Sequence, residues 1–284
     1  MPSKSPPSFG SQEYWDARFS SNAEPFEWLG APTALDASIV DALRIASEDR
    51  PQFLHIGSGT SLLSFHLRLH VEDASQIHNL DYSEVAVTLG QKRERGIAGV
   101  DPRLKDGQAP TYMRWDAVNL LDHNSLLHAC SRTAYSLIID KSTSDAISCA
   151  DDIYIPRPFP ISVDPYSPTD LDSTSIAEAI HPLYILAVNL ALVAKPRARW
   201  ITLSYSNDRF PFLNASSCSS AEHEVVPSPA TLWQLVEKSE VDNANQQPVE
   251  EAEATTVTHR PKVFNWLYIL ERTDVPLFLR GDHI

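Results

Sequence analysis

The stretch FLHIGSGTSLLS, residues 53–64, decides the fold that we expect for this chain. Its first residues form a short apolar run that is typical of a buried strand. The run breaks at Gly57-Ser58-Gly59 and then continues into a leucine-rich segment that suits a helix. A strand, a glycine turn and a helix together present backbone N–H groups to a ligand, and the glycines let that ligand approach the backbone closely.

Acidic residues stand where the following apolar runs end. The second run ends at Asp81, close to the spacing of about 20 residues at which an acid meets a ribose in doubly wound folds. Two further runs end at Asp116 and Asp140. Helical patterns separate these runs, and such alternation predicts a parallel sheet that is covered on both faces. Ligands of such sheets sit beyond the carboxyl ends of the strands, so we expect these acids around one site.

The rest of the chain divides by composition. Residues 1–12 are rich in Ser and Pro and are expected to be disordered, and residues 13–50 form an aromatic arm and a helix. Residues 51–284 are expected to form an α/β domain, a doubly wound, seven-stranded, mostly parallel sheet with a terminal antiparallel hairpin. A Pro-rich insertion near 151–172 and an acidic loop near 242–259, inside the hairpin, interrupt it.

Bulk properties exclude some classes of partner. The net charge of −14 over 284 residues argues against nonspecific binding to nucleic acid or to anionic membranes. The three cysteines, Cys130, Cys149 and Cys218, have no metal-ligand spacing, so we expect free thiols and no metal site. The N-terminal residues lack the apolar core of a signal peptide. These features predict a cytoplasmic protein, and we expect a monomer.

The segment EYWDARFSSNAEPFEWL, residues 13–29, carries an unusual density of aromatic side chains before the first strand. One interpretation is an arm that packs onto the domain through these rings. The other is a lid whose rings contact a flat or cationic ligand. Both can hold at once.

Five motifs in order over residues 14–146 resemble those of a known family. They are YWDARF (14–19) with FEW (26–28), GSGTSLLS (57–64), DYSEV (81–85), MRWD (113–116) and DKSTSDA (140–146). This combination resembles the class I S-adenosylmethionine-dependent methyltransferases, and more narrowly the group that methylates lysines or the N-terminus of translation elongation factor one-alpha. Beyond about residue 150 the likeness is thin, and the Pro-Gly-Gly that the family has before its fifth strand is replaced at residues 195–199.

The resemblance implies S-adenosylmethionine as the cofactor and assigns residues to it. The implied cofactor-binding residues are Trp15, Phe19, Trp28, Gly57, Ser58, Gly59, Asp81, Tyr82, Asp116, Ala117 and Lys141. In this assignment Asp81 accepts from both ribose hydroxyls, Asp116 accepts from the adenine amino group and Lys141 reaches the carboxylate of the cofactor. The competing cofactor is NAD, but a dinucleotide turn needs a third glycine where this chain has Leu62.

The resemblance places Asp140 and Asp145 at the reacting end of the site, as candidate catalytic residues that bind an incoming ammonium. Methyl transfer is an in-line displacement, so such residues mainly align the acceptor. The acceptor implied is a lysine of a protein such as elongation factor one-alpha. A small-molecule methyltransferase is the alternative enzyme, because the motifs on the acceptor side are altered. A binding module that has lost catalysis is the third hypothesis.

Overall fold

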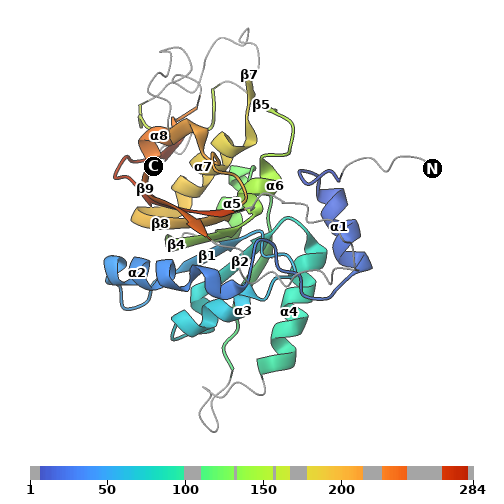
Figure 1. Ribbon diagram of the computed structural model, residues 1–284. Coiled ribbons are helices and arrows are strands. Elements are labelled where there is room, and N and C mark those ends of the chain that lie inside the picture. Colours follow the sequence, from blue (N-terminus) through green and yellow to red (C-terminus); the bar gives the residue numbers. More distant parts are fainter. Residues whose placement is uncertain are drawn as a thin grey trace, which may run out of the picture.

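The computed structural model describes residues 7–98, 110–130, 133–155, 158–166, 178–213, 226–241 and 264–280. A seven-stranded sheet in the order β3-β2-β1-β4-β8-β10-β9 lies at its centre (Figure 1). Its strands are β1 (Phe53–Ile56), β2 (Ile77–Asp81), β3 (Arg114–Ala117), β4 (Tyr135–Lys141), β8 (Ala194–Ser204), β9 (Trp233–Val241) and β10 (Asn265–Arg272). All pairings are parallel except those of β10, which is antiparallel to β8 and β9. The predicted doubly wound sheet with a terminal antiparallel hairpin is confirmed.

The central strands form where the sequence has continuous apolar runs. Every residue of β1, β2 and β4 is buried, as expected for parallel strands that helices cover on both faces. Alternate side chains of these strands enter two separate hydrophobic clusters. Leu54 and Ile138 belong to one cluster, whereas Phe53 and Leu137 belong to the other. The sheet therefore divides the core into two layers.

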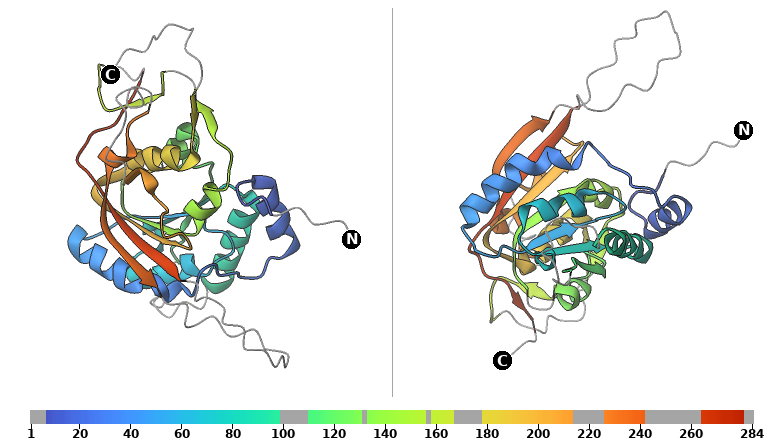
Figure 2. Two further views of the ribbon diagram at one scale, coloured as in Figure 1. Left: turned by 45° about the horizontal axis from the view of Figure 1, so that its top comes forward. Right: turned by 90° about the horizontal axis from the view of Figure 1, so that it is seen from below.

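Helices cover both faces of the sheet (Figures 1 and 2). One layer holds α2 (Asp36–Ala46), α3 (Leu63–Leu67) and α4 (Glu84–Ala98), and the other holds α5 (His123–Cys130), α6 (Thr143–Ile147) and α7 (Pro182–Val193). The aromatic arm contains α1 (Gln12–Ser21), which packs beside α4. Shorter helices are η1 (Pro32–Leu35), η2 (Arg68–His70), η3 (Ala74–Gln76), η4 (Pro211–Leu213) and α8 (Pro229–Leu232). Among the described residues, no helix combines the length and apolar character needed to cross a bilayer.

Two small sheets stand apart from the central one. In the first, β5 (Ile153–Ile155) pairs antiparallel with β7 (Glu178–Ile180), and in the second β6 (Ile161–Ser162) pairs with β11 (Phe278–Leu279). The described part of the Pro-rich insertion thus contains two short strands. The predicted acidic loop near 242–259 lies outside the described residues, as do residues 1–6 of the segment predicted to be disordered.

Two element boundaries depend on more than the apolar pattern. The pattern over residues 175–194 predicts a helix that Pro182 either kinks or begins, and α7 begins at Pro182. Proline is favoured in the first turn of a helix, and the ring of His181 accepts a hydrogen bond from the Leu183 N–H at 3.2 Å, which caps the helix there. The segment predicted as one strand from residue 231 begins with the last turn of α8 and becomes β9 only at Trp233.

Candidate functional site

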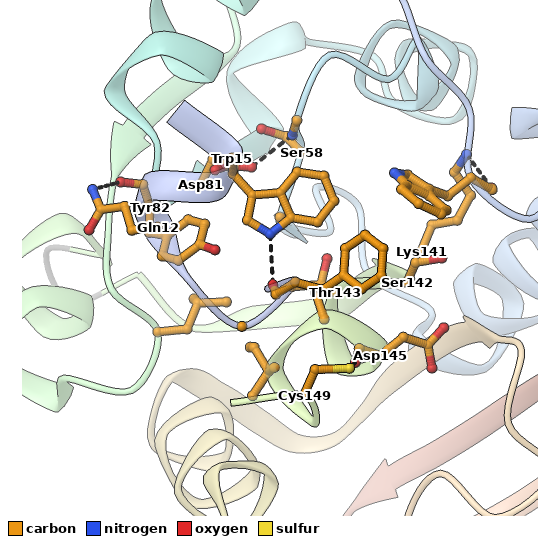
Figure 3. A pocket seen from close by; sticks show the side chains of 18 of the residues that line it. Gln12, Trp15, Ser58, Asp81, Tyr82, Lys141, Ser142, Thr143, Asp145 and Cys149 are labelled. Carbon is orange, nitrogen blue, oxygen red and sulfur yellow. Dashed lines mark hydrogen bonds between the residues drawn. The ribbon is translucent and has the colours of Figure 1, made fainter. Parts of the chain in front are cut away.

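A cavity of about 670 Å³ lies at the carboxyl ends of β1, β2 and β4. The glycine turn and the ends of these strands form its base, and the aromatic arm forms its wall and roof. Its lining residues are Phe9, Gly10, Ser11, Gln12, Glu13, Trp15, Phe19, Phe26, Trp28, Leu29, Gly57, Ser58, Gly59, Thr60, Ser61, Asp81, Tyr82, Val118, Asn119, Leu120, Leu121, Lys141, Ser142, Thr143, Asp145, Ala146, Ile147, Cys149, Ala150 and Tyr205. Figure 3 shows that side chains from the ends of β2 and β4, such as Asp81 and Lys141, and from the arm, such as Trp15, surround the same space.

The surroundings of the glycine turn leave no room for a side chain at Gly57. Gly57 has φ +58°, and a Cβ there would lie 2.1 Å from the Thr143 Oγ1. That hydroxyl donates to the Ile56 carbonyl oxygen at 2.9 Å, which holds the start of α6 against the end of β1. Gly59 has φ +51° and faces the ring of Phe19. The turn is therefore packed between α6 and the aromatic arm, as a close backbone approach requires.

Asp81, the last residue of β2, lines the cavity beside the glycine turn. Its Oδ2 accepts the Gly59 N–H at 2.8 Å, and its Oδ1 accepts the Ser83 N–H at 2.9 Å. Burial raises the pKa of Asp81 to about 6, although the two amides act in the opposite direction. Each carboxylate oxygen has two lone pairs, so both can still accept from a ligand.

The aromatic arm both packs on the domain and lines the cavity. The rings of Trp15 and Phe19 stack with centroids 5.6 Å apart, and the Trp15 Nε1–H donates to the Phe9 carbonyl oxygen at 2.8 Å. The Tyr82 hydroxyl donates to the Ser11 carbonyl oxygen at 2.9 Å. Both sequence interpretations of the arm therefore agree with the geometry, and Phe9 and Ser11 of the segment predicted to be disordered take part in it.

The arm reaches across the cavity to the segment that follows α6. A Cβ on Gly10 would lie 2.6 Å from backbone atoms of Ala150, so the two segments are in direct contact. On the opposite side the Gln12 Nε2–H donates to the Tyr82 carbonyl oxygen at 2.8 Å (Figure 3). The segment Gly10–Gln12 thus spans the cavity from Ala150, after α6, to Tyr82, which follows β2.

Lys141, at the end of β4, is bound by the arm. Its Nζ donates to the Glu27 carboxylate and to the carbonyl oxygens of Trp28 at 3.0 Å and Gly30 at 3.3 Å. Glu27 also accepts from the Ser61 hydroxyl at 2.7 Å. Burial lowers the pKa of Lys141, while Glu27 favours its charged form. Glu27 was not among the predicted site residues, although its place between Phe26 and Trp28 was a signal.

The two predicted catalytic acids have different positions. Asp140 does not line the cavity: its Oδ1 accepts the Thr143 N–H at 2.9 Å and the Ser144 N–H at 3.3 Å, so it caps α6. Burial raises the pKa of Asp140 to about 6. Asp145 does line the cavity, but its Oδ1 is 2.8 Å from Arg209 Nη2 and accepts the Ser204 hydroxyl at 2.5 Å. Asp145 is therefore already paired.

Asp116 and Ala117, predicted to bind adenine, are not brought to the cavity. Asp116 Oδ2 is 2.7 Å from His78 Nε2, and burial lowers the pKa of His78 to about 4, so a neutral ring donates this hydrogen bond. Asn119 lines the cavity instead. Asn119 was not among the predicted site residues, and it lies two residues beyond the end of β3.

Two buried hydroxyls of the cavity lining have no partner among the described residues. They belong to Ser58, in the glycine turn, and to Ser142, which follows Lys141. A buried polar group without a hydrogen bond is costly, so these hydroxyls suit a polar ligand. Ser142 also has φ +69°, a left-handed conformation that is unfavourable for a residue with a Cβ. Strain and unsatisfied groups of this kind gather at ligand sites.

A curated protein is similar in sequence to part of the chain. Methyltransferase srdJ of Neurospora crassa is 35% identical to the chain over 148 residues, which are 51% of this chain and 57% of that relative. The chain thus matches little more than half the length of this curated relative. No family model matches the chain.

Solved structures resemble the chain over most of its length. One, described as "Conversion of a Disulfide Bond into a Thioacetal Group during Echinomycin Biosynthesis", is 16% identical, with a TM-score of 0.50 and 93% of both chains covered. The N-methyltransferase NodS from Bradyrhizobium japonicum WM9, in complex with S-adenosyl-L-homocysteine, is 12% identical, with a TM-score of 0.49 and coverages of 95% and 100%. At 16% identity the first of these likenesses concerns the fold alone. The α/β fold with a seven-stranded, mostly parallel sheet is that expected from the sequence.

Proposed function

We propose that the chain is an S-adenosylmethionine-dependent methyltransferase. One observation carries this proposal: Asp81 and the Gly57–Gly59 turn face one cavity that the aromatic arm closes. The cavity volume of about 670 Å³ is within the range of about 300–1,000 Å³ that small-molecule and cofactor sites occupy. The 35% identity to a curated methyltransferase supports the same activity.

The residues of the cavity fit the cofactor. The glycine turn would hold its methionyl part, Asp81 would accept from the ribose hydroxyls, and Asn119 would meet the adenine edge in place of Asp116. The unpartnered hydroxyls of Ser58 and Ser142 would bond to its polar groups. When bound, the cofactor supplies a methyl group on a sulfonium, for which aromatic faces are favourable neighbours.

The chain's own residues would align the acceptor and exclude water. The segment Gly10–Gln12, which contacts Ala150, would cover the cavity, and the contact of Lys141 with Glu27 holds the arm at the end of β4. Such closure aligns donor and acceptor for in-line transfer. Asp140 would act only by holding the start of α6, next to Ser142 and Thr143.

The geometry favours a small uncharged acceptor over a protein lysine. A lysine must lose its proton to attack, and a carboxylate that binds the incoming ammonium favours its charged form. Of the carboxylates that line the cavity, Asp145 is paired with Arg209 and Asp81 accepts two backbone N–H groups, while the exposed Glu13 accepts the Ser11 hydroxyl. Apolar side chains such as Ile147 line the cavity beside Asp145. The protein lysine remains the competing acceptor, because the sequence motifs resemble those of the elongation factor group.

Two measurements test these proposals. Titration calorimetry with S-adenosylmethionine and S-adenosylhomocysteine should give micromolar affinities, and the cofactor assignment fails if neither binds. Incubation with cofactor labelled in its methyl group and a cell extract should place the label in the small-molecule fraction. The Asp81→Ala variant is the control and should transfer no label. A labelled protein band would instead support the lysine acceptor.

A further inference from the structure

A second cluster of ligating side chains lies outside the cavity. Asp36 Oδ1 is 2.6 Å from His66 Nε2 and 3.0 Å from His70 Nε2. The three ligand atoms all lie within 4.8 Å of one another, and the three residues are half-buried. None of the three residues lines the cavity.

The local fold explains why these side chains converge. His66 and His70 are four residues apart on the continuous helical segment formed by α3 and η2, so their side chains lie on the same face. Their ring centroids are 5.8 Å apart and the ring planes make an angle of 71°. Asp36 is the first residue of α2, which packs in the same layer, and it turns its carboxylate toward both rings. Two separate helical segments thus supply the three ligands.

We propose that Asp36, His66 and His70 bind a divalent transition-metal ion, with zinc as the best fit. Imidazole nitrogen with one carboxylate suits zinc, whereas calcium and magnesium prefer oxygen ligands. Metal–ligand bonds of about 2.0–2.1 Å in a tetrahedron place ligand atoms about 3.3 Å apart. The separations of 2.6 and 3.0 Å therefore need to open by about 0.7 and 0.3 Å. Since the site is half-buried, water can complete the coordination.

The position of the site indicates a structural role. It joins the start of α2 to the segment that directly follows the glycine turn. A bound ion would replace two hydrogen bonds by three metal–ligand bonds between these segments, and it would stabilise the folded chain by mass action. This proposal does not rest on the proposed methyl transfer, because its ligands are separate from the cavity.

The test uses the full chain without an affinity tag, stripped of metal by a chelator. Calorimetric titration with zinc chloride should give one ion per chain with micromolar or tighter affinity, and thermal unfolding should shift to higher temperature with zinc. Asp36→Asn and His70→Ala should each weaken binding at least tenfold and abolish the shift. His128→Ala, an exposed histidine on α5, is the matched control and should behave as the parent chain.

Two results would overturn the proposal. One is the absence of zinc binding by the parent chain. The other is affinity that survives in the His66→Ala/His70→Ala double variant, which would place the ion elsewhere. If His70→Ala fails to fold, Asp36→Asn decides, because asparagine keeps a hydrogen-bond acceptor for both rings while it removes the charged ligand. Visible absorption of bound cobalt gives a second readout, since its pattern reports tetrahedral coordination.

Discussion

Three aspartates near the ends of strands β2, β3 and β4 have different contacts in this fold. Asp81, at the end of β2, faces the cavity and the glycine turn. Asp116 in β3 bonds to His78 on the sheet, and Asp140 in β4 caps the start of α6. Neither of these two lines the cavity. The same residue type at similar places along three strands thus serves a ligand site, a buried network and a helix cap.

The strand register explains the difference. In the sheet register Asp116 is paired with Leu80 and Asp140 with Ile56, so these residues form one row across the sheet. Each of the two aspartates is one residue before the end of its own strand. Asp81 belongs to the next row, level with Ala117. Successive side chains of a strand point to opposite faces, so a shift by one row moves a carboxylate to the other side of the sheet. An acid near a strand end is therefore a site residue only in the correct row.

The largest expected effect separates Asp81 from Asp116. Asp81→Ala should weaken binding of S-adenosylhomocysteine by about 100-fold, since it removes the acceptor of two hydrogen bonds, and bonds to charged groups contribute about 1.5–3 kcal/mol each. Asp116→Ala should change the affinity by less than about threefold. Calorimetry on both variants measures the contrast, with circular dichroism as the control for folding. Equal losses of affinity in the two variants would contradict the explanation by strand register.

We expect substitutions of Asp140 to change the free energy of unfolding more than the rate of the reaction. Asp140→Ala leaves two N–H groups at the start of α6 without their acceptor, and we expect a loss of about 1–2 kcal/mol in the free energy of unfolding. Asp140→Asn keeps an acceptor oxygen and should retain activity within about threefold. Urea unfolding and initial rates measure the two effects. An inactive but stable Asp140→Asn chain would show that the charge itself takes part in the reaction.

The next effect is a dependence of stability and of ligand affinity on pH, which arises from Asp81. Because the pKa of Asp81 rises from 3.8 to about 6 on folding, its protonated form stabilises the folded chain below about pH 4, and this stability is lost as the pH rises to about 6. Ligand affinity should change in the opposite direction and fall about tenfold per pH unit below pH 6, since the ribose hydroxyls need the ionised carboxylate.

Calorimetry between pH 5 and 7.5 measures this trend. Asp81→Asn should remove the dependence of the affinity on pH, whereas Asp140→Asn should keep it, although burial raises the pKa of Asp140 to about 6 as well. A pH dependence that disappears with Asp140 and persists without Asp81 would reverse the assignment of the two carboxylates.

The smallest effect concerns Ser142, which has a left-handed backbone conformation directly after β4. Ser142→Gly should raise the free energy of unfolding by about 0.5–1 kcal/mol, because glycine adopts φ +69° without strain. It should also lower the affinity for S-adenosylhomocysteine a few-fold, since it removes an unpartnered hydroxyl of the cavity. Ser47→Gly is the matched control: this serine has φ +49° at the end of α2, so the change should stabilise the chain without a change in affinity.

Most of the central sheet could be predicted from local patterns. Apolar runs that end at Gly57, Asp81 and Asp140 are long and clearly bounded, and β1, β2 and β4 form where they stand, although β4 continues to Lys141. The third strand is polar and short, so its end was placed at Asp116 although β3 continues to Ala117 and the cavity begins at Val118. Weak local signals leave such a boundary to the pairing with the neighbouring strand.

Pairings between distant segments could not be predicted from the sequence. The short strands β5 and β7 carry no distinctive pattern and exist through their contact with each other. The position of β10 between β8 and β9 likewise depends on the whole sheet. The pairing of Asp145 with Arg209, which removes a free carboxylate from the cavity, joins α6 to the segment after β8. Sequence spacing carries no information about such a contact.

The sequence by itself determined the doubly wound sheet, the glycine turn and the acid opposite it, because hydrophobic periodicity and glycine conformation are local properties. The tertiary structure alone decided which acids reach the cavity, because register and helix packing set the direction of each side chain. It also brought Asp36 to His66 and His70, and bound Lys141 to Glu27. These contacts arise only when separate layers of the fold pack together.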